Sequence, residues 1–313
     1  MRMSILIILF CLRMVVFSQS RSYSKEFSVL TDNDVFFFRD YYYTAGQDLA
    51  YKKLIDSTSH LFKTFAKSDT SKILLTYKIG IKLFTPRGIS QTEISQMDRP
   101  YAGYDYISIG IKRFDLVDRG FSFSVDLGLV GESSRLGQVQ SWWHKILKLR
   151  APRGWASQIR DEVVLNVNYK YWRSWRLKNK FDVASTSSVN AGTGSNKLSQ
   201  DLTFRILNFK TLKESNFSGS FLSKNTRKKG ELFFFGGIGF DYVFSNIFIE
   251  GSLFNNNQSP FVLDALPIIF RQHVGLIYST PKWSYSSTIT HLSKEVAGGI
   301  DHIYGSLDIG FRF

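Results

Sequence analysis

Residues 72–83, KILLTYKIGIKL, decide the fold because two kinds of side chain alternate along them. One face is apolar and consists of Ile73, Leu75, Tyr77, Ile79, Ile81 and Leu83. The other face is rich in lysine and consists of Lys72, Thr76, Lys78, Gly80 and Lys82. Alternation with a period of two predicts a β-strand with one apolar and one polar side. Such a long run exceeds the usual strand of about five or six residues and suits the ~9–11 residues that cross a bilayer.

The same alternation recurs along most of the chain. It predicts strands near 25–37, 43–56, 71–85, 101–114, 120–131, 159–175, 179–192, 198–209, 231–245, 265–279, 282–294 and 302–313. The resulting strand count is even, as single-chain bacterial outer-membrane barrels require. We therefore predict an all-β fold, a transmembrane antiparallel β-barrel of about 12 strands with a short extracellular helix.

A polar sheet face has two possible surroundings. In a soluble β-sandwich it is the solvated outer surface, whereas in a membrane barrel it lines the lumen and the apolar face contacts lipid. The barrel is favoured by the terminal Phe313 and by aromatic residues at strand ends, such as 41–43, Trp172 and Trp175. Because backbone polar groups in lipid must all be paired, the sheet is expected to close.

The N-terminus and the composition indicate where the protein works. Residues 1–18 have a basic start and a short apolar run, which predicts a cleaved signal peptide, with 19–313 as the outer-membrane β-barrel domain. We expect Sec export to the bacterial outer membrane and, because the only cysteine is Cys11, no disulfide in the mature chain. The net charge of +14 indicates an anionic partner, and without a zinc pattern or recognition helix we expect no nucleic acid.

One segment has the spacing of a helix. Residues 137–150, GQVQSWWHKILKLR, are followed by Pro152, which cannot continue a helix. The apolar residues on one side of this helix are Val139, Trp142 or Trp143, Ile146 and Leu149. Because a lone helix of this length is marginal in water, we expect its apolar side to sit on the barrel rim or in the outer leaflet.

Oxygen-bearing side chains gather where the first predicted strand ends. Asp32, Asn33 and Asp34 follow one another there, and Thr44 opens the next strand. Such residues are poor strand formers and good ligands for a hard cation, so Asp34 and Asn33 are candidate metal ligands. The alternative is an acidic turn that caps a hairpin, because Asp and Asn are common turn residues.

His144 is the candidate base, although a histidine on an amphipathic helix is often only a surface or capping residue. The chain has no GxSxG, HExxH or phosphate-binding glycine loop, so no serine nucleophile is visible. An imidazole, a carboxylate and an amide on a cation, and a nearby hydroxyl would suffice for ester hydrolysis by activated water.

Four separated motifs resemble those of the outer-membrane lipid A 3′-O-deacylases. They are ND at 33–34, YTAG at 43–46, DRPYAG at 98–103, and the segment that runs from Gly131 through GQVQ to His144. The resemblance implies a barrel that removes the 3′ acyloxyacyl group from lipid A in the outer leaflet. It also implies dependence on a divalent cation, usually calcium (Ca²⁺).

The resemblance further implies a role for each matching residue. His144 would be the general base on water, Asp34 would bind the cation, and Asn33 and Thr44 would position the cation, the water or the ester. The family also has a lysine in the loop after the third strand, where this chain has Arg87 and no lysine. The role of that lysine is therefore either unfilled or passes to Arg87 or Arg99.

Basic residues near His144 suit the phosphorylated head of lipid A. We name Lys145 and Lys148 as substrate-binding candidates, although a basic rim that snorkels to the membrane surface is an equally good interpretation. The partners expected are lipopolysaccharide and outer-membrane lipids, with a monomeric protein. Two alternative functions are an outer-membrane phospholipase A and a catalytically inactive barrel or porin.

Overall fold

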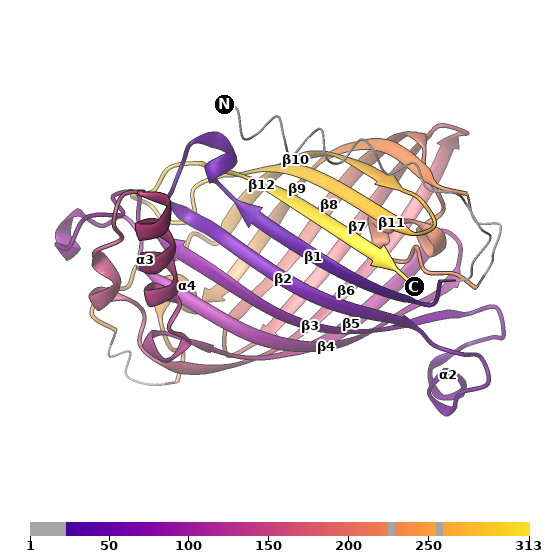
Figure 1. The fold of residues 1–313 in the computed structure, drawn as a ribbon, viewed down its shortest axis with the longest axis horizontal. Coiled ribbons are helices and arrows are strands. Elements are labelled where there is room, and N and C mark those ends of the chain that lie inside the picture. The colour runs from indigo at the N-terminus through magenta and orange to yellow at the C-terminus, as the bar shows by residue number, and fades with distance from the viewer. Residues whose placement is uncertain (1–22, 225–228, 255–258) are drawn as a thin grey trace.

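The structure, a computed structural model, describes residues 23–224, 229–254 and 259–313, so the predicted signal peptide 1–18 lies outside the described residues. Within the described part, twelve antiparallel strands close into one barrel, in which β1 pairs with β12 (Figure 1). The strands are β1 (Lys25–Asn33), β2 (Tyr42–Leu54), β3 (Lys72–Thr85), β4 (Ala102–Leu116), β5 (Arg119–Val130), β6 (Glu162–Lys178), β7 (Phe181–Gly192), β8 (Ser195–Asn208), β9 (Glu231–Asn246), β10 (Ile268–Ser279), β11 (Trp283–Leu292) and β12 (His302–Arg312). The predicted fold class is confirmed.

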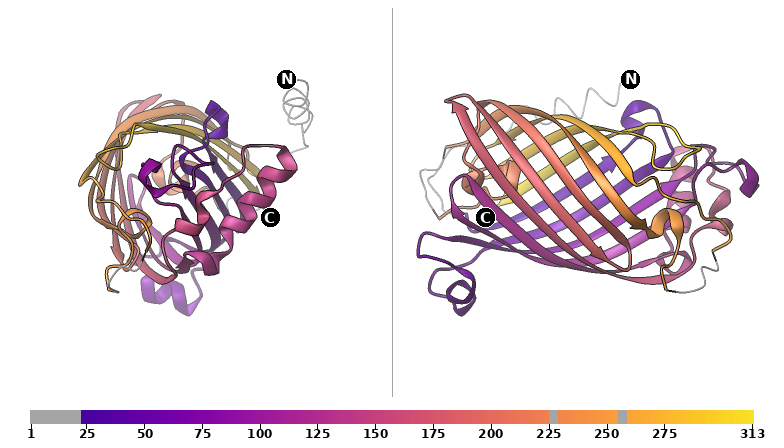
Figure 2. Two further views of the ribbon diagram at one scale, coloured as in Figure 1. Left: turned by 90° about the vertical axis from the view of Figure 1, so that its left-hand side faces the viewer. Right: turned by 180° about the vertical axis from the view of Figure 1, so that it is seen from behind.

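The two ends of the barrel carry different connections. We call the end with the connections that follow β1, β3, β5, β7, β9 and β11 the outer end, and the opposite end the inner end. The helix α3 (Leu136–Leu147) lies across one side of the outer end, and α4 (Ile247–Glu250) lies at the same end (Figures 1 and 2). The helix α2 (His60–Phe65) projects from the inner end. The short 3-10 helices are η1 (Val35–Phe37), η2 (Ile94–Gln96), η3 (Glu132–Ser134), η4 (Gly154–Ser157), η5 (Leu212–Glu214) and η6 (Asn216–Ser218).

The strand faces follow the predicted alternation. On β3, Tyr77 and Ile79 are exposed on the outside, while Lys78 and Lys82 line an internal cavity of about 690 Å³. Neighbouring strands continue the apolar outside, and we call this surface the lipid-facing belt; it includes Phe27, Ile79, Ile107, Leu129, Leu165, Phe240 and Leu307. Within the described residues, no helix combines the length and apolarity needed to cross a membrane.

The first strand ends earlier than the alternation predicts. The sequence pattern extends to residue 37, but β1 stops at Asn33 and η1 follows. The Asn33 side-chain Oδ1 accepts the Val35 backbone N–H at 2.7 Å, and the Asp34 carbonyl accepts the Phe37 N–H at 2.9 Å. Local side-chain bonds of this kind compete with the strand ladder. The prediction of strand at 34–37 is therefore wrong.

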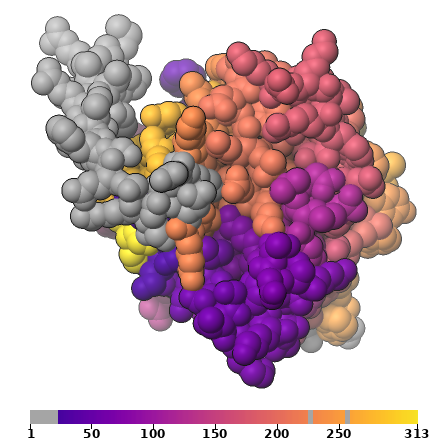
Figure 3. Space-filling model, turned by 90° about the vertical axis from the view of Figure 1, so that its right-hand side faces the viewer, coloured from indigo at the N-terminus to yellow at the C-terminus, as the bar shows by residue number. Residues whose placement is uncertain are grey.

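Aromatic side chains fill the lumen towards both ends. At the outer end, Phe248 of α4 stacks on Phe84 at 4.9 Å between ring centroids and lies 5.2 Å from the ring of Tyr104. At the inner end, the connection between β8 and β9 folds inward, and its Phe217 lies 5.9 Å from the ring of Phe235. Figure 3 shows this connection in orange over the inner end. Both clusters narrow the space in which the central cavity lies.

Candidate active site

The loop between β1 and β2 holds the first candidate residues. Asp34 is 1% exposed, and its Oδ2 accepts the Tyr41 backbone N–H at 2.8 Å, which closes the loop on itself. Burial raises the pKa of the Asp34 carboxyl to about 8. Asn33 stands at the end of β1, directly before it. The loop thus presents an amide and a buried carboxyl at the outer end of one wall.

Thr44 occupies an irregular point of the adjacent strand. Tyr43 pairs with Phe84 and Ala45 pairs with Leu83, so Thr44 is the extra residue of a β-bulge. Its hydroxyl is buried and donates to the Leu83 carbonyl at 3.4 Å. Bulges change the direction of a side chain and are common beside active sites. The sequence indicated Thr44 through its place at the start of the second strand and through the YTAG motif, but it did not indicate the bulge.

The helix α3 brings His144 to the barrel wall. Leu136, Gln140 and His144 are its buried residues, and their spacing of four places them on one face. Leu136 packs in a cluster that includes Leu83 of the outer barrel wall, and Gln140 accepts the indole N–H of Trp155 at 2.9 Å. The predicted helix is confirmed, with its end three residues earlier than expected. His144 is therefore held between α3 and the barrel.

The hydrogen bond to His144 determines which ring nitrogen is basic. Lys148 takes a left-handed conformation (φ 56°) that ends α3 and turns the chain back on itself. The Arg150 carbonyl oxygen then lies 2.6 Å from His144 Nδ1. Because a carbonyl oxygen can only accept, Nδ1 carries the hydrogen and Nε2 of the neutral ring is free to take a proton.

Asp40 is a site residue that sequence reasoning missed. Its Oδ2 lies 3.8 Å from His144 Nε2. Burial raises the pKa of Asp40, the neighbouring imidazole opposes this shift, and the charge of Asp40 raises the pKa of Asp34 further. Asp40 therefore lies near both Asp34 and His144, and we call these three residues the acid–imidazole cluster. The signal was a second carboxyl in the same short loop as Asp34.

The chemistry of the cluster suits a hard cation. Asp34 is buried, Asp40 is partly exposed, and the charge of Asp40 raises the pKa of Asp34, so a divalent cation beside the two carboxyls would offset their repulsion. Calcium prefers carboxylate, amide, hydroxyl and water oxygens. In the described part of the chain, no three His, Cys, Asp or Glu residues are grouped to hold a metal ion. A cation here would therefore need amide, backbone or water oxygens beside the two carboxylates.

Three of the four predicted substrate-binding residues are exposed at the outer end. Lys145 and Lys148 lie at the end of α3, and Arg87 lies in the connection between β3 and β4. The Arg87 backbone N–H donates to Asp98 Oδ1 at 2.9 Å, and the Tyr42 hydroxyl donates to Asp98 Oδ2 at 2.7 Å. Asp98 therefore fixes the Arg87 loop to the start of β2.

The fourth, Arg99, has a different environment from the one we expected. It is 1% exposed, it pairs with Glu295, and its guanidinium lies 4.5 Å from the centre of the Phe84 ring. A side chain so enclosed has no surface to offer a substrate phosphate, so the expected contact is not supported. Arg99 instead joins the connection after β3 to the connection after β11.

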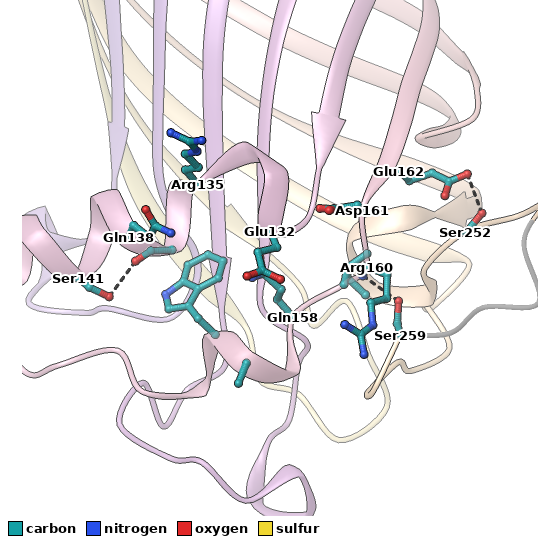
Figure 4. A pocket seen from close by; sticks show the side chains of 14 residues that line it. Glu132, Arg135, Gln138, Ser141, Gln158, Arg160, Asp161, Glu162, Ser252 and Ser259 are labelled. Carbon is teal, nitrogen blue, oxygen red and sulfur yellow. Dashed lines mark hydrogen bonds between the residues drawn. The ribbon is translucent and has the colours of Figure 1, made fainter.

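A separate hollow of about 1140 Å³ lies on the other side of α3 (Figure 4). Gln138 and Ser141 of α3 line it together with Arg160 and Glu162. Its lining includes no member of the acid–imidazole cluster. The exposed polar side of α3 thus faces this hollow, while the buried side holds His144.

Comparisons with known proteins agree with this architecture. Residues 5–313 match the family model described as outer membrane protein LpxR. The structure of LpxR from Salmonella typhimurium superposes with a TM-score of 0.73 at 19% identity, covering 92% of this chain and 100% of that one. The β-domain of the Bordetella autotransporter BrkA has a TM-score of 0.46 at 6% identity, with 94% and 99% covered. No curated protein sequence matches the chain. Because the family model matches nearly the whole chain, the chain belongs to the outer membrane protein LpxR family.

Proposed function

We propose that this chain is a calcium-dependent ester hydrolase that removes the 3′ acyloxyacyl group of lipid A in the outer leaflet. Membership of the LpxR family supports an outer-membrane enzyme that modifies lipid A. The observation that carries the chemical part is the orientation of His144. Its Nδ1 is occupied by the Arg150 carbonyl, so the basic Nε2 is directed towards the loop that holds Asp34 and Asp40.

His144 acts as a general base in this proposal. Nε2 takes a proton from a water molecule, whose oxygen attacks the carbonyl carbon of the 3′ ester. The bond from that carbon to the 3′ oxygen then breaks, and the proton on Nε2 passes to the leaving oxygen. The products are a free 3′ hydroxyl and an acyloxyacyl carboxylic acid. The Arg150 carbonyl keeps the ring in one tautomer, and the Asp40 carboxylate stabilises the transient imidazolium.

Asp34 and Asn33 provide the oxygen ligands proposed for calcium. Thr44 provides the hydroxyl that the motifs assign to positioning the cation, the water or the ester. When bound, the cation would supply positive charge to the ester oxygen as negative charge develops there. The exposed Arg87, Lys145 and Lys148 offer positive charge to the phosphates of lipid A.

The structure is equally compatible with a phospholipase A, but it gives no support to a porin. A phospholipase A would use the same groups, so only the identity of the substrate separates it from the proposal. A porin needs an open lumen, and the aromatic clusters around Phe248 and Phe217 give that alternative no support.

Mass spectrometry of lipid A tests the proposal directly. Cells that express the chain should lose the mass of the 3′ acyloxyacyl group, and Asp34→Asn or a calcium chelator should prevent this loss. Asp69→Asn, an exposed carboxyl in the connection that carries α2, is the matched control and should behave as the wild type. Unchanged lipid A together with release of fatty acid from glycerophospholipids would establish the phospholipase instead.

A further inference from the structure

We infer that two exposed apolar surfaces beside the acid–imidazole cluster insert into the acyl-chain region of the outer leaflet. The first is the aromatic tip, formed by Val35, Phe36 and Phe38. The second is the apolar arc of α3, formed by Val139, Trp142, Trp143, Ile146 and Leu147, together with Leu149 just past the end of the helix. The choice of lipid rests on the proposed function, and the occupant is anionic lipid of the leaflet that contains the substrate.

The aromatic tip is apolar yet faces away from the protein. Val35 is 51% exposed, Phe36 is 54% exposed and Phe38 is 100% exposed. Phe38 also takes a left-handed conformation (φ 57°), which is uncommon for a bulky residue. A fully exposed phenylalanine in such a conformation gains nothing from the protein core. Contact with lipid would give it the burial that the fold does not provide.

The position of Phe36 places the tip on the lipid side of the wall. A Cβ atom on Gly305 would lie 2.8 Å from the Phe36 ring. Gly305 belongs to the outward-facing residues of β12, as does the exposed Leu307 two residues further along the strand. Gly305 thus leaves room for the ring on the outer wall, and the aromatic tip continues the lipid-facing belt.

The side chains of α3 form three arcs around the helix axis, and each arc has different surroundings. The arc on the barrel contains Gln140 and His144, and the arc towards the hollow contains Gln138 and Ser141. The third arc is apolar and stays exposed, with Trp142 at 60%. A helix of a soluble protein buries its apolar arc in the core. The reverse arrangement is typical of a helix that lies in a membrane interface.

Basic residues adjoin the apolar arc. Lys145, Lys148 and Arg150 are exposed at the end of α3 beside Trp142 and Ile146. Long basic side chains reach lipid phosphates while the apolar neighbours enter the acyl chains. This charge, together with the continuity of the aromatic tip with the lipid-facing belt, selects anionic lipid as the occupant.

The two surfaces belong to the same two segments as the proposed catalytic groups. The aromatic tip follows Asp34 directly and precedes Asp40, and the apolar arc belongs to the helix that carries His144. Insertion of both would hold the acid–imidazole cluster at the depth where acyl esters join a lipid head group. An ester could then reach His144 from the membrane side without leaving the leaflet.

Spin labels measure this insertion without any activity. Single-cysteine variants Phe38→Cys and Trp142→Cys, in a Cys11→Ser background, are placed in vesicles of phosphatidylglycerol and phosphatidylcholine. Leu129→Cys in the lipid-facing belt and Ser141→Cys on the polar arc are the references. We expect the labels at 38 and 142 to resemble 129, with high accessibility to oxygen and low accessibility to a water-soluble nickel chelate. Accessibilities that match 141 would overturn the inference.

An activity measurement separates this inference from the proposed function. For Phe36→Ser with Phe38→Ser, deacylation should fall about tenfold more in vesicles than in detergent micelles, because only the vesicle requires insertion. Equal losses in both would indicate a purely structural tip and refute the inference. If the wild type deacylates no lipid A in either system, the proposed function fails, while the spin labels still decide the insertion.

Discussion

The loop between β1 and β2 at the outer end differs from the inner end in how its buried charge is compensated. At the inner end, acids are matched with bases: Glu26 contacts Lys52 at 2.7 Å and Arg312 at 2.6 Å, and Asp182 accepts from Arg205 Nε at 2.9 Å. At the outer end, Asp40 lies 3.8 Å from His144, and its charge adds to the burial that raises the pKa of Asp34, while Arg39 opposes this shift. Removing one partner of a buried ion pair is costly, and a buried carboxyl without a close cationic partner is often a functional group.

The backbone shows the same division. Of the non-glycine residues described with positive φ, those at the outer end are Phe38, Tyr42, Arg135 and Lys148, and Leu207 stands in β8 towards the inner end. Each such residue costs free energy and persists only where surrounding contacts hold it. Most of the strained backbone conformations thus lie at the outer end, where the candidate site is.

The largest expected effect concerns the outer end. His144→Gln should lower the deacylation rate about 10²–10⁴-fold, because the general base is lost while the ring's neighbours remain. Heat-modifiable migration on a gel should stay that of the folded barrel. His60→Gln, an exposed histidine of α2 at the inner end, is the control and should keep wild-type activity. If the His144→Gln variant deacylated lipid A at the wild-type rate, His144 would not be the general base, and the outer end would have no functional group in this comparison.

The next effect concerns the inner end. Arg205 is 0% exposed, pairs with Asp182 and lies 4.7 Å from the centre of the Phe209 ring. Arg205→Ala should lower the free energy of unfolding by about 3–5 kcal/mol, because it leaves a buried carboxylate unpaired. Urea unfolding of the barrel in vesicles measures this change.

Two further results sharpen the Arg205 prediction. The folded fraction of Arg205→Ala should retain wild-type deacylation, and Arg176→Ala, which removes an exposed cation near the same Phe209 ring, should change the free energy of unfolding by less than about 1 kcal/mol. Loss of activity in the folded fraction would show that the two ends are coupled.

The smallest effect concerns the basic residues at the end of α3. Lys145→Gln with Lys148→Gln should lower the preference of the membrane-embedded barrel for anionic over zwitterionic lipid by about 1 kcal/mol per charge, and added salt should reduce the difference from the wild type. Quenching of tryptophan fluorescence by brominated anionic and zwitterionic lipids at two salt concentrations measures this preference. Lys63→Gln, on the inner-end helix α2, tests whether position matters. An equal effect of Lys63→Gln would mean that net charge alone is responsible.

The fold was predictable because its determinants are local. The period of two along stretches such as 72–83 depends only on which side of a strand faces lipid. The misassigned residues 34–37 follow Asn33, whose side chain bonds to the backbone in competition with the strand. Amphipathic spacing likewise located α3. The sequence left open whether its apolar side sits on the barrel rim or in the outer leaflet, and in the structure that side is exposed.

The candidate site was only partly predictable. Motifs identified Asn33, Asp34, Thr44 and His144, but the burial of Arg99 depends on Glu295, a partner 196 residues away. Asp40 was missed because its only signal was its place in the same short loop as Asp34, and a loop carboxylate is common on any protein surface.

The group that orients His144 belongs to the main chain. Any residue at position 150 supplies the same carbonyl, so side-chain substitutions there can accumulate without disturbing the imidazole. An insertion or deletion between 144 and 150 would instead move the acceptor away from Nδ1. Related enzymes with this design should therefore vary freely in residue type along this turn while keeping its length.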